Sequence, residues 1–377
     1  MADIKIGGSS GEDGLTYVGV IDEIWVSKDN KIRRSDGQTP GGIVISSEGG
    51  GGATAWAEIT DINNANGPSK IAIGLEAGKT TQSDIAVAIG SNAGLTNQGT
   101  ESVAIGRLAG KLNQGAQTIA IGPEAGRDDQ GANGIAIGHE AAFSDQAEFG
   151  LAIGEKAGNR NQGIRSIGIG RSSGKTDQGT KAVSIGDAAG YATQGQGAIA
   201  IGDQAGETTQ SEGAVAIGTQ SGETTQGLHS VAIGDQAGKT TQGNMAVAVG
   251  VFAGETNQTG GAVAVGRNAG ETNQGAEATA IGAGAAKDDQ GTGAVAIGQL
   301  AGETNQGNYA ISIGANAGII NQAANSIVIN AGGTQLDTTQ TGEFLVKPVR
   351  DVAGATLPAG FKKVAYNPAT GEFISYG

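Results

Sequence analysis

The central part of the chain repeats every sixteen residues without an insertion or a deletion. Phrases of the type Val-Ala-Ile-Gly end at a glycine that recurs from Gly74 to Gly314, which makes sixteen repeats. A glutamine follows eight residues after every one of these glycines. Surface loops drift in length, so an unbroken period indicates that each repeat stacks on the one before it. The period therefore predicts a solenoid rather than a string of separate domains.

Each repeat begins with the alternation typical of a β-strand. Two large aliphatic residues flank a small one, and the small residue is Ala in thirteen of the sixteen repeats. Because successive strand residues point to opposite faces, both faces of this strand avoid water. We expect the large residues to fill the coil and the small ones to meet a close partner. This predicts a homo-oligomer in which Ala104 and Ala232 lie near a neighbouring chain.

The second half of each repeat, as in Ala-Gly-Glu-Thr-Asn-Gln-Gly, is polar and rich in turn formers. The fourth residue after the repeat glycine is also Gly, except at Ala142 and Ala286, which suggests a positive φ angle or a close backbone approach. Sixteen residues suit two short strands and two turns. The fold class predicted is all-β: a parallel β-roll of sixteen 16-residue coils, homotrimeric, with small β units at each end.

The glutamine is identical in all sixteen repeats. In a parallel stack, identical residues lie one above another, and a primary amide can donate to one neighbour and accept from the other. A glutamine that only satisfies the backbone of its own turn is the alternative. We therefore predict a structural ladder of Gln82, Gln98, Gln114, Gln130, Gln146, Gln162, Gln178, Gln194, Gln210, Gln226, Gln242, Gln258, Gln274, Gln290, Gln306 and Gln322.

Composition excludes several classes of protein. The chain has 70 Gly among 377 residues, no Cys and 3% aromatic residues, but its apolar periodicity argues against disorder. A net charge of -14 disfavours nucleic acid or an anionic membrane as a partner. No apolar window is long enough to span a membrane, so no membrane insertion is expected. The first residues contain no basic stretch followed by an apolar core, so we expect no secretory signal peptide.

The repeats resemble the head repeats of YadA-type trimeric adhesins. The likeness rests on "ESVAIG", "RSIGIG" and "HSVAIG", which end at Gly106, Gly170 and Gly234, and it covers about two thirds of the chain. It implies a left-handed parallel β-roll in which three chains pack side by side. The period of sixteen is longer than usual for that family, and the invariant glutamine is not part of its signature. We also expect no terminal membrane β-barrel of the kind that anchors these adhesins.

The two ends resemble different proteins. "FLVKPVR", followed by "KKVAYNPATGEFISYG", looks like the closing segment of phage and giant-virus fibre proteins, and "TAWAEITDINN" resembles connector phrases of phage tail fibres. Residues 367–371 supply a turn between two strand-like segments, and residues 22–37 suggest another hairpin. The expected organisation is an N-terminal β attachment unit (1–48), a Gly-rich linker and connector (49–70), the β-roll (71–333) and a C-terminal β cap or tip (334–377).

Catalytic and metal-binding patterns are lacking, so we expect no enzyme activity, no cofactor and no metal. The two histidines, His139 and His229, occupy different positions of the repeat. Asp128-Asp129 and Asp288-Asp289 lie ten coils apart and lack the spacing of known calcium-binding rolls.

The function expected is a structural fibre or spike protein of a virus or phage. Its partners would be two further copies of itself, other virion proteins and a host-surface receptor, and its location would be the virion surface. Aromatic residues concentrate near the C-terminus. One interpretation is that they form the small core of a trimeric cap; the other adds receptor contacts on the loop 351–360, so contacts are expected at Asp351, Thr356 and Phe361. A trimeric adhesin on a bacterial cell surface is one alternative. An ice-binding solenoid is another, because nine repeats carry Thr at the sixth position, from Thr208 to Thr272 without a break.

Overall fold

A computed structural model describes residues 70–348 in full. Outside this range it describes the backbone of five short strands, at 24–26, 32–34, 43–44, 363–367 and 372–376. The chain divides into two units, Met1–Asn159 and Arg160–Gly377, and each is considered by itself. Both units contain parallel β-solenoid, and the two together have about 17 turns. No helix occurs among the described residues.

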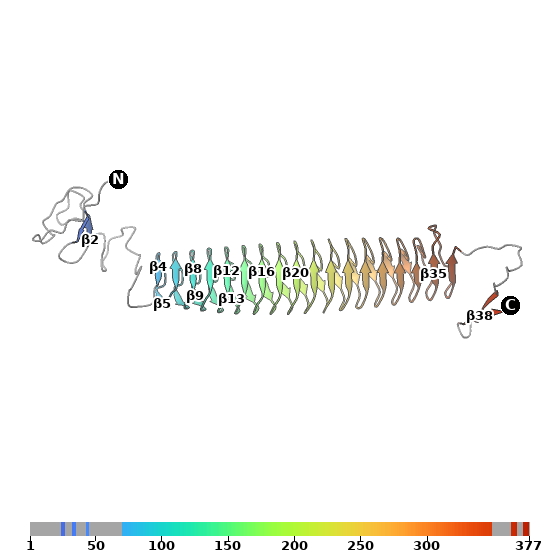
Figure 1. Ribbon diagram of the computed structural model, residues 1–377, viewed down its shortest axis with the longest axis horizontal. Coiled ribbons are helices and arrows are strands. Elements are labelled where there is room, and N and C mark those ends of the chain that lie inside the picture. The colour runs from blue at the N-terminus through green and yellow to red at the C-terminus, as the bar shows by residue number, and fades with distance from the viewer. Residues whose placement is uncertain are drawn as a thin grey trace, which may run out of the picture. The chain divides into compact units, whose positions relative to one another are not determined.

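Each turn of the solenoid contains two short strands on opposite sides of the coil. Figure 1 shows this for the first unit, where β4, β8 and β12 lie on one side and β5, β9 and β13 on the other. Strands on each side pair in parallel with a shift of one repeat, so that Val103 is the partner of Ile119 and Gln114 that of Gln130. The predicted flattened roll of two strands and two turns is confirmed.

One sheet, here called the aliphatic sheet, contains the Val-Ala-Ile segments. In the first unit its strands are β4 (Ile71–Ile73), β6 (Val87–Ile89), β8 (Val103–Ile105), β10 (Ile119–Ile121), β12 (Ile135–Ile137) and β14 (Leu151–Ile153). In the second unit they are β16 (Ile167–Ile169), β18 (Val183–Ile185), β20 (Ile199–Ile201), β22 (Val215–Ile217), β24 (Val231–Ile233), β26 (Val247–Val249), β28 (Val263–Val265), β30 (Thr279–Ile281), β32 (Val295–Ile297), β34 (Ile311–Ile313), β35 (Ile327–Asn330) and β36 (Phe344–Lys347).

The other sheet, here called the glutamine sheet, contains the segments that end in Gln. In the first unit its strands are β5 (Thr80–Gln82), β7 (Thr96–Gln98), β9 (Leu112–Gln114), β11 (Asp128–Gln130) and β13 (Ser144–Gln146). In the second unit they are β15 (Arg160–Gln162), β17 (Thr176–Gln178), β19 (Thr193–Gln194), β21 (Thr209–Gln210), β23 (Thr225–Gln226), β25 (Thr241–Gln242), β27 (Thr256–Gln258), β29 (Thr272–Gln274), β31 (Asp288–Gln290) and β33 (Thr304–Gln306).

Three short elements were expected at the ends of the chain, and two of them form as predicted. Near the N-terminus β1 (Ile24–Val26) and β2 (Ile32–Arg34) pair as an antiparallel hairpin, to which β3 (Ile43–Val44) adds a third strand. Near the C-terminus β37 (Lys363–Asn367) and β38 (Glu372–Tyr376) form the second hairpin. The third segment, "FLVKPVR", differs from the expectation. Its strand β36 pairs in parallel with β35 and so extends the aliphatic sheet beyond the expected end of the roll at residue 333.

The interior of the roll is made of small residues and glutamines. Alanines of the aliphatic sheet, such as Ala104 and Ala232, have no exposed surface, and the largest fully buried side chains are all Gln. The prediction that Ala104 and Ala232 face a neighbouring chain is therefore wrong, because both methyl groups point into the coil of their own chain. Two sheets joined by such short turns lie too close together to hold aliphatic side chains between them.

Glycines line the closest contacts between coils. The repeat glycine Gly90 has φ +126°, and a Cβ at this position would lie 2.6 Å from the carbonyl oxygen of Gly106 in the next coil. Four residues later, Gly94 has φ +53°, and a Cβ there would lie 2.6 Å from Oε1 of Gln98. Both expectations for these glycines, a positive φ and a close approach, are met at once.

The residue before each glutamine decides how its strand pairs. Asn97 and Asn113 occupy the left-handed region, with φ of 55° and 53°, as Asn tolerates well. In two coils with paired threonines before the glutamine, β21 and β23 begin one residue later, and Thr209 pairs directly with Thr225. A β-branched side chain favours this extended conformation, since the left-handed region crowds it. Thr81 of β5 is an exception, with φ 58°.

The buried glutamines form a ladder. In the second unit, Nε2 of each Gln from Gln162 to Gln306 donates to Oε1 of the Gln one coil further, at 2.9–3.2 Å. In the first unit, Gln114 donates to Gln130 and Gln130 to Gln146. The ladder does not reach the two N-terminal members, because Oε1 of Gln98 and Oε1 of Gln114 have no hydrogen-bond partner.

The same amides also join the two sheets. Gln210 Nε2 donates to the backbone oxygen of Ile199 at 2.7 Å, and Ile199 begins the aliphatic strand of the same coil. It also donates to the oxygen of Ala214, where the next coil begins, at 3.2 Å. The alternative interpretation, a glutamine bonded to its own turn, is thus also partly right, because amides of the ladder such as Gln210 serve both purposes, while Gln82 and Gln98 donate to backbone oxygens.

Replacing Gln210 by Leu should destabilise the solenoid. The change leaves the amide of Gln194, Oε1 of Gln226 and the oxygen of Ile199 short of a partner, at a cost of about 1–3 kcal/mol for each buried group. Denaturant unfolding followed by circular dichroism measures the loss. The control is Thr209→Leu, which changes the exposed neighbour in the same strand. Equal stability of the two variants would contradict the ladder's role.

Candidate functional site

The aliphatic sheet presents its large side chains outwards. Since the alanine of each Val-Ala-Ile segment points inwards, the residues on either side of it must point away from the roll. Ile121, Ile185 and Ile233 each expose 37% of their surface, and Ile281 exposes 39%. These fractions are high for residues on a continuous sheet, and they show that no other part of residues 70–348 covers these side chains.

Two parallel columns make up this outward surface, which we call the aliphatic face. In the first unit the columns contain Val87, Val103, Ile119, Ile135 and Leu151, and Ile89, Ile105, Ile121, Ile137 and Ile153. In the second unit one polar residue interrupts them, Thr279 of β30. The second unit's columns continue to β36, where Phe344 is 50% and Val346 38% exposed.

The opposite side of the roll is polar. The residue before the glutamine is exposed in every fully described coil, and it is Thr, Asn or Asp throughout. Its side chain often bonds to the same position of the next coil, as from Asn97 to Asn113 at 2.9 Å. Each chain therefore has one face that water solvates poorly and one that water solvates well.

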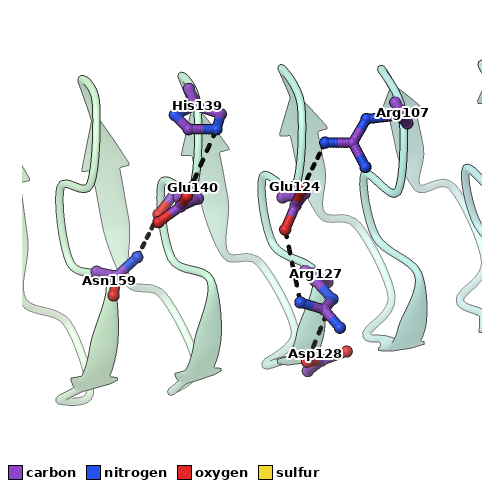
Figure 2. Close-up of polar contacts among 7 residues, drawn as sticks. All are labelled: Arg107, Glu124, Arg127, Asp128, His139, Glu140 and Asn159. Atoms are coloured by element: carbon purple, nitrogen blue, oxygen red, sulfur yellow. Dashed lines mark hydrogen bonds and ion pairs between the residues drawn. The ribbon is translucent and has the colours of Figure 1, made fainter.

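A cluster of charged residues lies on the turns of the first unit, as Figure 2 shows. Arg107 Nη2 lies 2.6 Å from Glu124 Oε1, and Arg127 Nη1 lies 3.5 Å from Glu124 Oε2. Arg127 also lies over the ring of Phe143, 4.7 Å from its centre, and its Nε is 3.6 Å from Asp128 Oδ2. These charges neutralise one another across neighbouring coils, so the cluster supports the register of the stack.

His139 belongs to the same surface and is half exposed. Its Nε2 lies 3.5 Å from Glu140 Oε1, and Asn159 Nδ2 donates to the backbone oxygen of Glu140 at 2.9 Å (Figure 2). His229 lies in the other unit, where its ring covers Gly213.

In the second unit five Glu and three Lys share the fifth position after the repeat glycine, and carboxylates stack directly in the pairs Glu207–Glu223 and Glu255–Glu271. Burial raises the pKa of Glu207 above its ordinary value of 4.5, and the carboxylates of Glu223 and Asp203 raise it further, while a hydrogen bond from Gln204 lowers it. Burial also raises the pKa of Glu255, followed by the charge of Glu271, against the opposing effect of Lys239. Lys239 lies 3.7 Å from Glu223 and relieves part of this repulsion.

The residues predicted to contact a receptor, Asp351, Thr356 and Phe361, lie outside the described residues. Within residues 70–348, no group of three or more acidic, His or Cys side chains is arranged to hold a metal ion. In the same part of the chain, no helix has the length and apolar character needed to cross a membrane. The aliphatic face is thus the most extensive candidate surface for an interaction.

Comparisons with known proteins assign no family. No protein-family model matches the chain, and neither a curated protein nor a solved structure matches it. The candidate surface must therefore be interpreted from its own chemistry.

The raised pKa values predict that stability depends on pH. A carboxyl whose folded pKa exceeds 4.5 contributes stability that is fully present below pH 4.5 and is lost as the pH rises through the folded pKa. Glu207→Gln should therefore raise the free energy of unfolding at pH 7, and with it the unfolding temperature. The gain should be less than about 1 kcal/mol because the site is partly exposed. The gain should vanish at pH 4. Thermal unfolding at both pH values tests this, with Glu212→Gln, an exposed carboxylate, as the control.

Proposed function

We propose that the protein is the structural fibre or spike of a virus or phage, built as a homotrimer of solenoids. The observation that carries this proposal is the aliphatic face, which is continuous along the strands of each unit and is left uncovered by the other residues between 70 and 348. An uncovered apolar surface of this extent is typical of an obligate contact between subunits. Burying it requires further copies with the same repeat, since only these match its spacing of one coil.

A trimer satisfies this requirement with closed symmetry. Each chain has one aliphatic sheet, and three such sheets can surround a common axis while the three glutamine sheets face water. The resemblance of the "SVAIG" repeats to trimeric adhesin heads supports the same number of chains. Because the outward residues are Val and Ile, an interface formed by this face buries far more apolar area than one formed by Ala would.

The terminal segments support the viral assignment. "FLVKPVR" and the hairpin β37–β38 resemble the closing segment of virus fibre proteins, and residues 1–48 are proposed to attach the fibre to the virion. Contacts with a host receptor are proposed at Asp351, Thr356 and Phe361. The net charge of -14 supports a protein partner over nucleic acid.

Charge introduced on the aliphatic face should prevent assembly. The unmodified protein is expected to have three times the mass of one chain in light scattering. The double variant Val231→Lys, Ile233→Lys should be a monomer or aggregate, because association would bury two ammonium groups in an apolar contact. The matched control, Thr225→Lys with Thr241→Lys, places the same charges on the glutamine sheet and should remain trimeric. A monodisperse monomer of the unmodified protein would refute the trimer.

The location of the protein needs a separate experiment. Antibodies against the solenoid should label projections on purified virions in electron microscopy. Labelling of a bacterial cell surface instead would favour the adhesin and refute the virion assignment.

A further inference from the structure

The outer face of the glutamine sheet contains a second ladder, formed by exposed side chains. Asn257 Nδ2 donates to Oδ1 of Asn273 at 3.0 Å, and Asn273 Nδ2 donates to Oδ1 of Asp289 at 2.8 Å. One coil beyond Asp289, Asn305 Nδ2 donates to Oδ1 of Asn321 at 3.0 Å. Every bond runs in the same direction, from one coil to the next.

This ladder has a gap between Asp289 and Asn305. An ionised carboxylate only accepts hydrogen bonds, so Asp289 cannot donate to the next coil as an asparagine does. Among the described residues, neither Asp289 Oδ2 nor Asn305 Oδ1 has a hydrogen-bond partner. Two acceptors on coils about 4.8 Å apart thus face water without a donor between them.

A shallow groove of about 490 Å³ lies at this gap. Its lining includes the three ladder residues Asn273, Asp289 and Asn305 together with Asn308, and the glycines Gly291 and Gly307 form part of its wall. Asn308 Oδ1 accepts a hydrogen bond from the backbone nitrogen of Thr292 at 2.9 Å, so its amide nitrogen remains available as a donor. The groove therefore offers two acceptors, one donor and a backbone surface that a ligand can approach closely.

An exposed aromatic residue directly follows the groove-lining Asn308 in the chain. Tyr309 follows Asn308 in the chain, has φ 57° and is 63% exposed. Its ring lies over Gly293 of the preceding coil, where an added Cβ would come within 2.9 Å of the ring carbon Cδ1. The ring edge that carries Cδ1 and Cε1 thus lies against Gly293, and much of the side chain remains exposed to solvent.

We propose that this groove binds a neutral oligosaccharide. Hydroxyl groups of a sugar supply the donors that Asp289 and Asn305 lack, and ring oxygens or hydroxyls accept from Asn308. The apolar side of a sugar ring packs on Tyr309. The carboxylate of Asp289, on a chain of charge -14, excludes acidic sugars. A calcium ion is not a match, because it takes six to eight oxygen ligands and the groove contributes a single carboxylate.

The site does not depend on the proposed function. It lies on the glutamine sheet, on the opposite side of the coil from the aliphatic face, so a monomer and a trimer present it equally. In a fibre it would place recognition on the solenoid itself, in addition to any receptor contact near the C-terminus.

The experiment measures binding of the full-length protein to a panel of immobilised neutral hexasaccharides, built from glucose, galactose, mannose or N-acetylglucosamine, and to a hyaluronan hexasaccharide. At least one neutral probe should bind and the acidic one should not. Asp289→Asn should weaken binding at least about tenfold, because the new amide donates to Asn305 and closes the gap. The same variant should unfold at an equal or higher temperature, so lost binding cannot reflect lost folding.

Matched variants in the first unit serve as controls. Asp129→Asn makes the same change at the same position of the repeat, and Phe149→Ser corresponds to Tyr309→Ser. The proposal requires that both first-unit variants bind normally and that Tyr309→Ser binds weakly. It is overturned if no neutral hexasaccharide binds, if Asp289→Asn binds as the unmodified protein does, or if Asp129→Asn loses binding equally.

Discussion

The hydrogen bonds of the buried glutamine determine how this solenoid is built. One amide reaches across the coil to the opposite sheet, and the same amide bonds to the next coil, as Gln210 does with Ile199 and Gln226. This reach is possible only if the two sheets lie close together, and most other interior residues are accordingly Ala, Ser or Gly, with Val328 of β35 as an exception near the end of the sheet. The core is thus held by polar bonds more than by aliphatic packing.

Because the interior is narrow, most of the large apolar residues lie on the outer face of the roll. The Val and Ile residues of the aliphatic sheet have no room between the sheets, so they form columns on its outer face. A chain whose largest apolar surface lies outside cannot satisfy the hydrophobic effect alone. The proposed trimer would cover this surface, and the polar opposite face would keep such an assembly from adding further copies.

Departures from the repeat have local consequences that the repeat itself does not reveal. An Asp in place of Asn interrupts an exposed amide ladder at Asp289, and Thr in place of Asn changes the backbone of β21 and its neighbours. Burial raises the pKa of Glu207, and the carboxylate of Glu223 raises it further because a parallel stack holds equivalent residues one coil apart. Because equivalent residues stack one coil apart, a single substitution in one repeat changes the hydrogen bonds or charges of the surface at that coil.

The sequence by itself determined the solenoid, its sixteen-residue coil, both terminal hairpins and the column of glutamines, because each depends on spacing along the chain. Only the tertiary structure decided which face of the strand is inside. Alternation separates Ala232 from Val231 and Ile233, but it does not say which set is buried, and the usual rule that large apolar residues fill a core led to the wrong answer. The width of the coil decides this, and width depends on how far a glutamine reaches between the two sheets. The groove beside Asp289 likewise exists only because coils stack, bringing residues sixteen apart in the chain together.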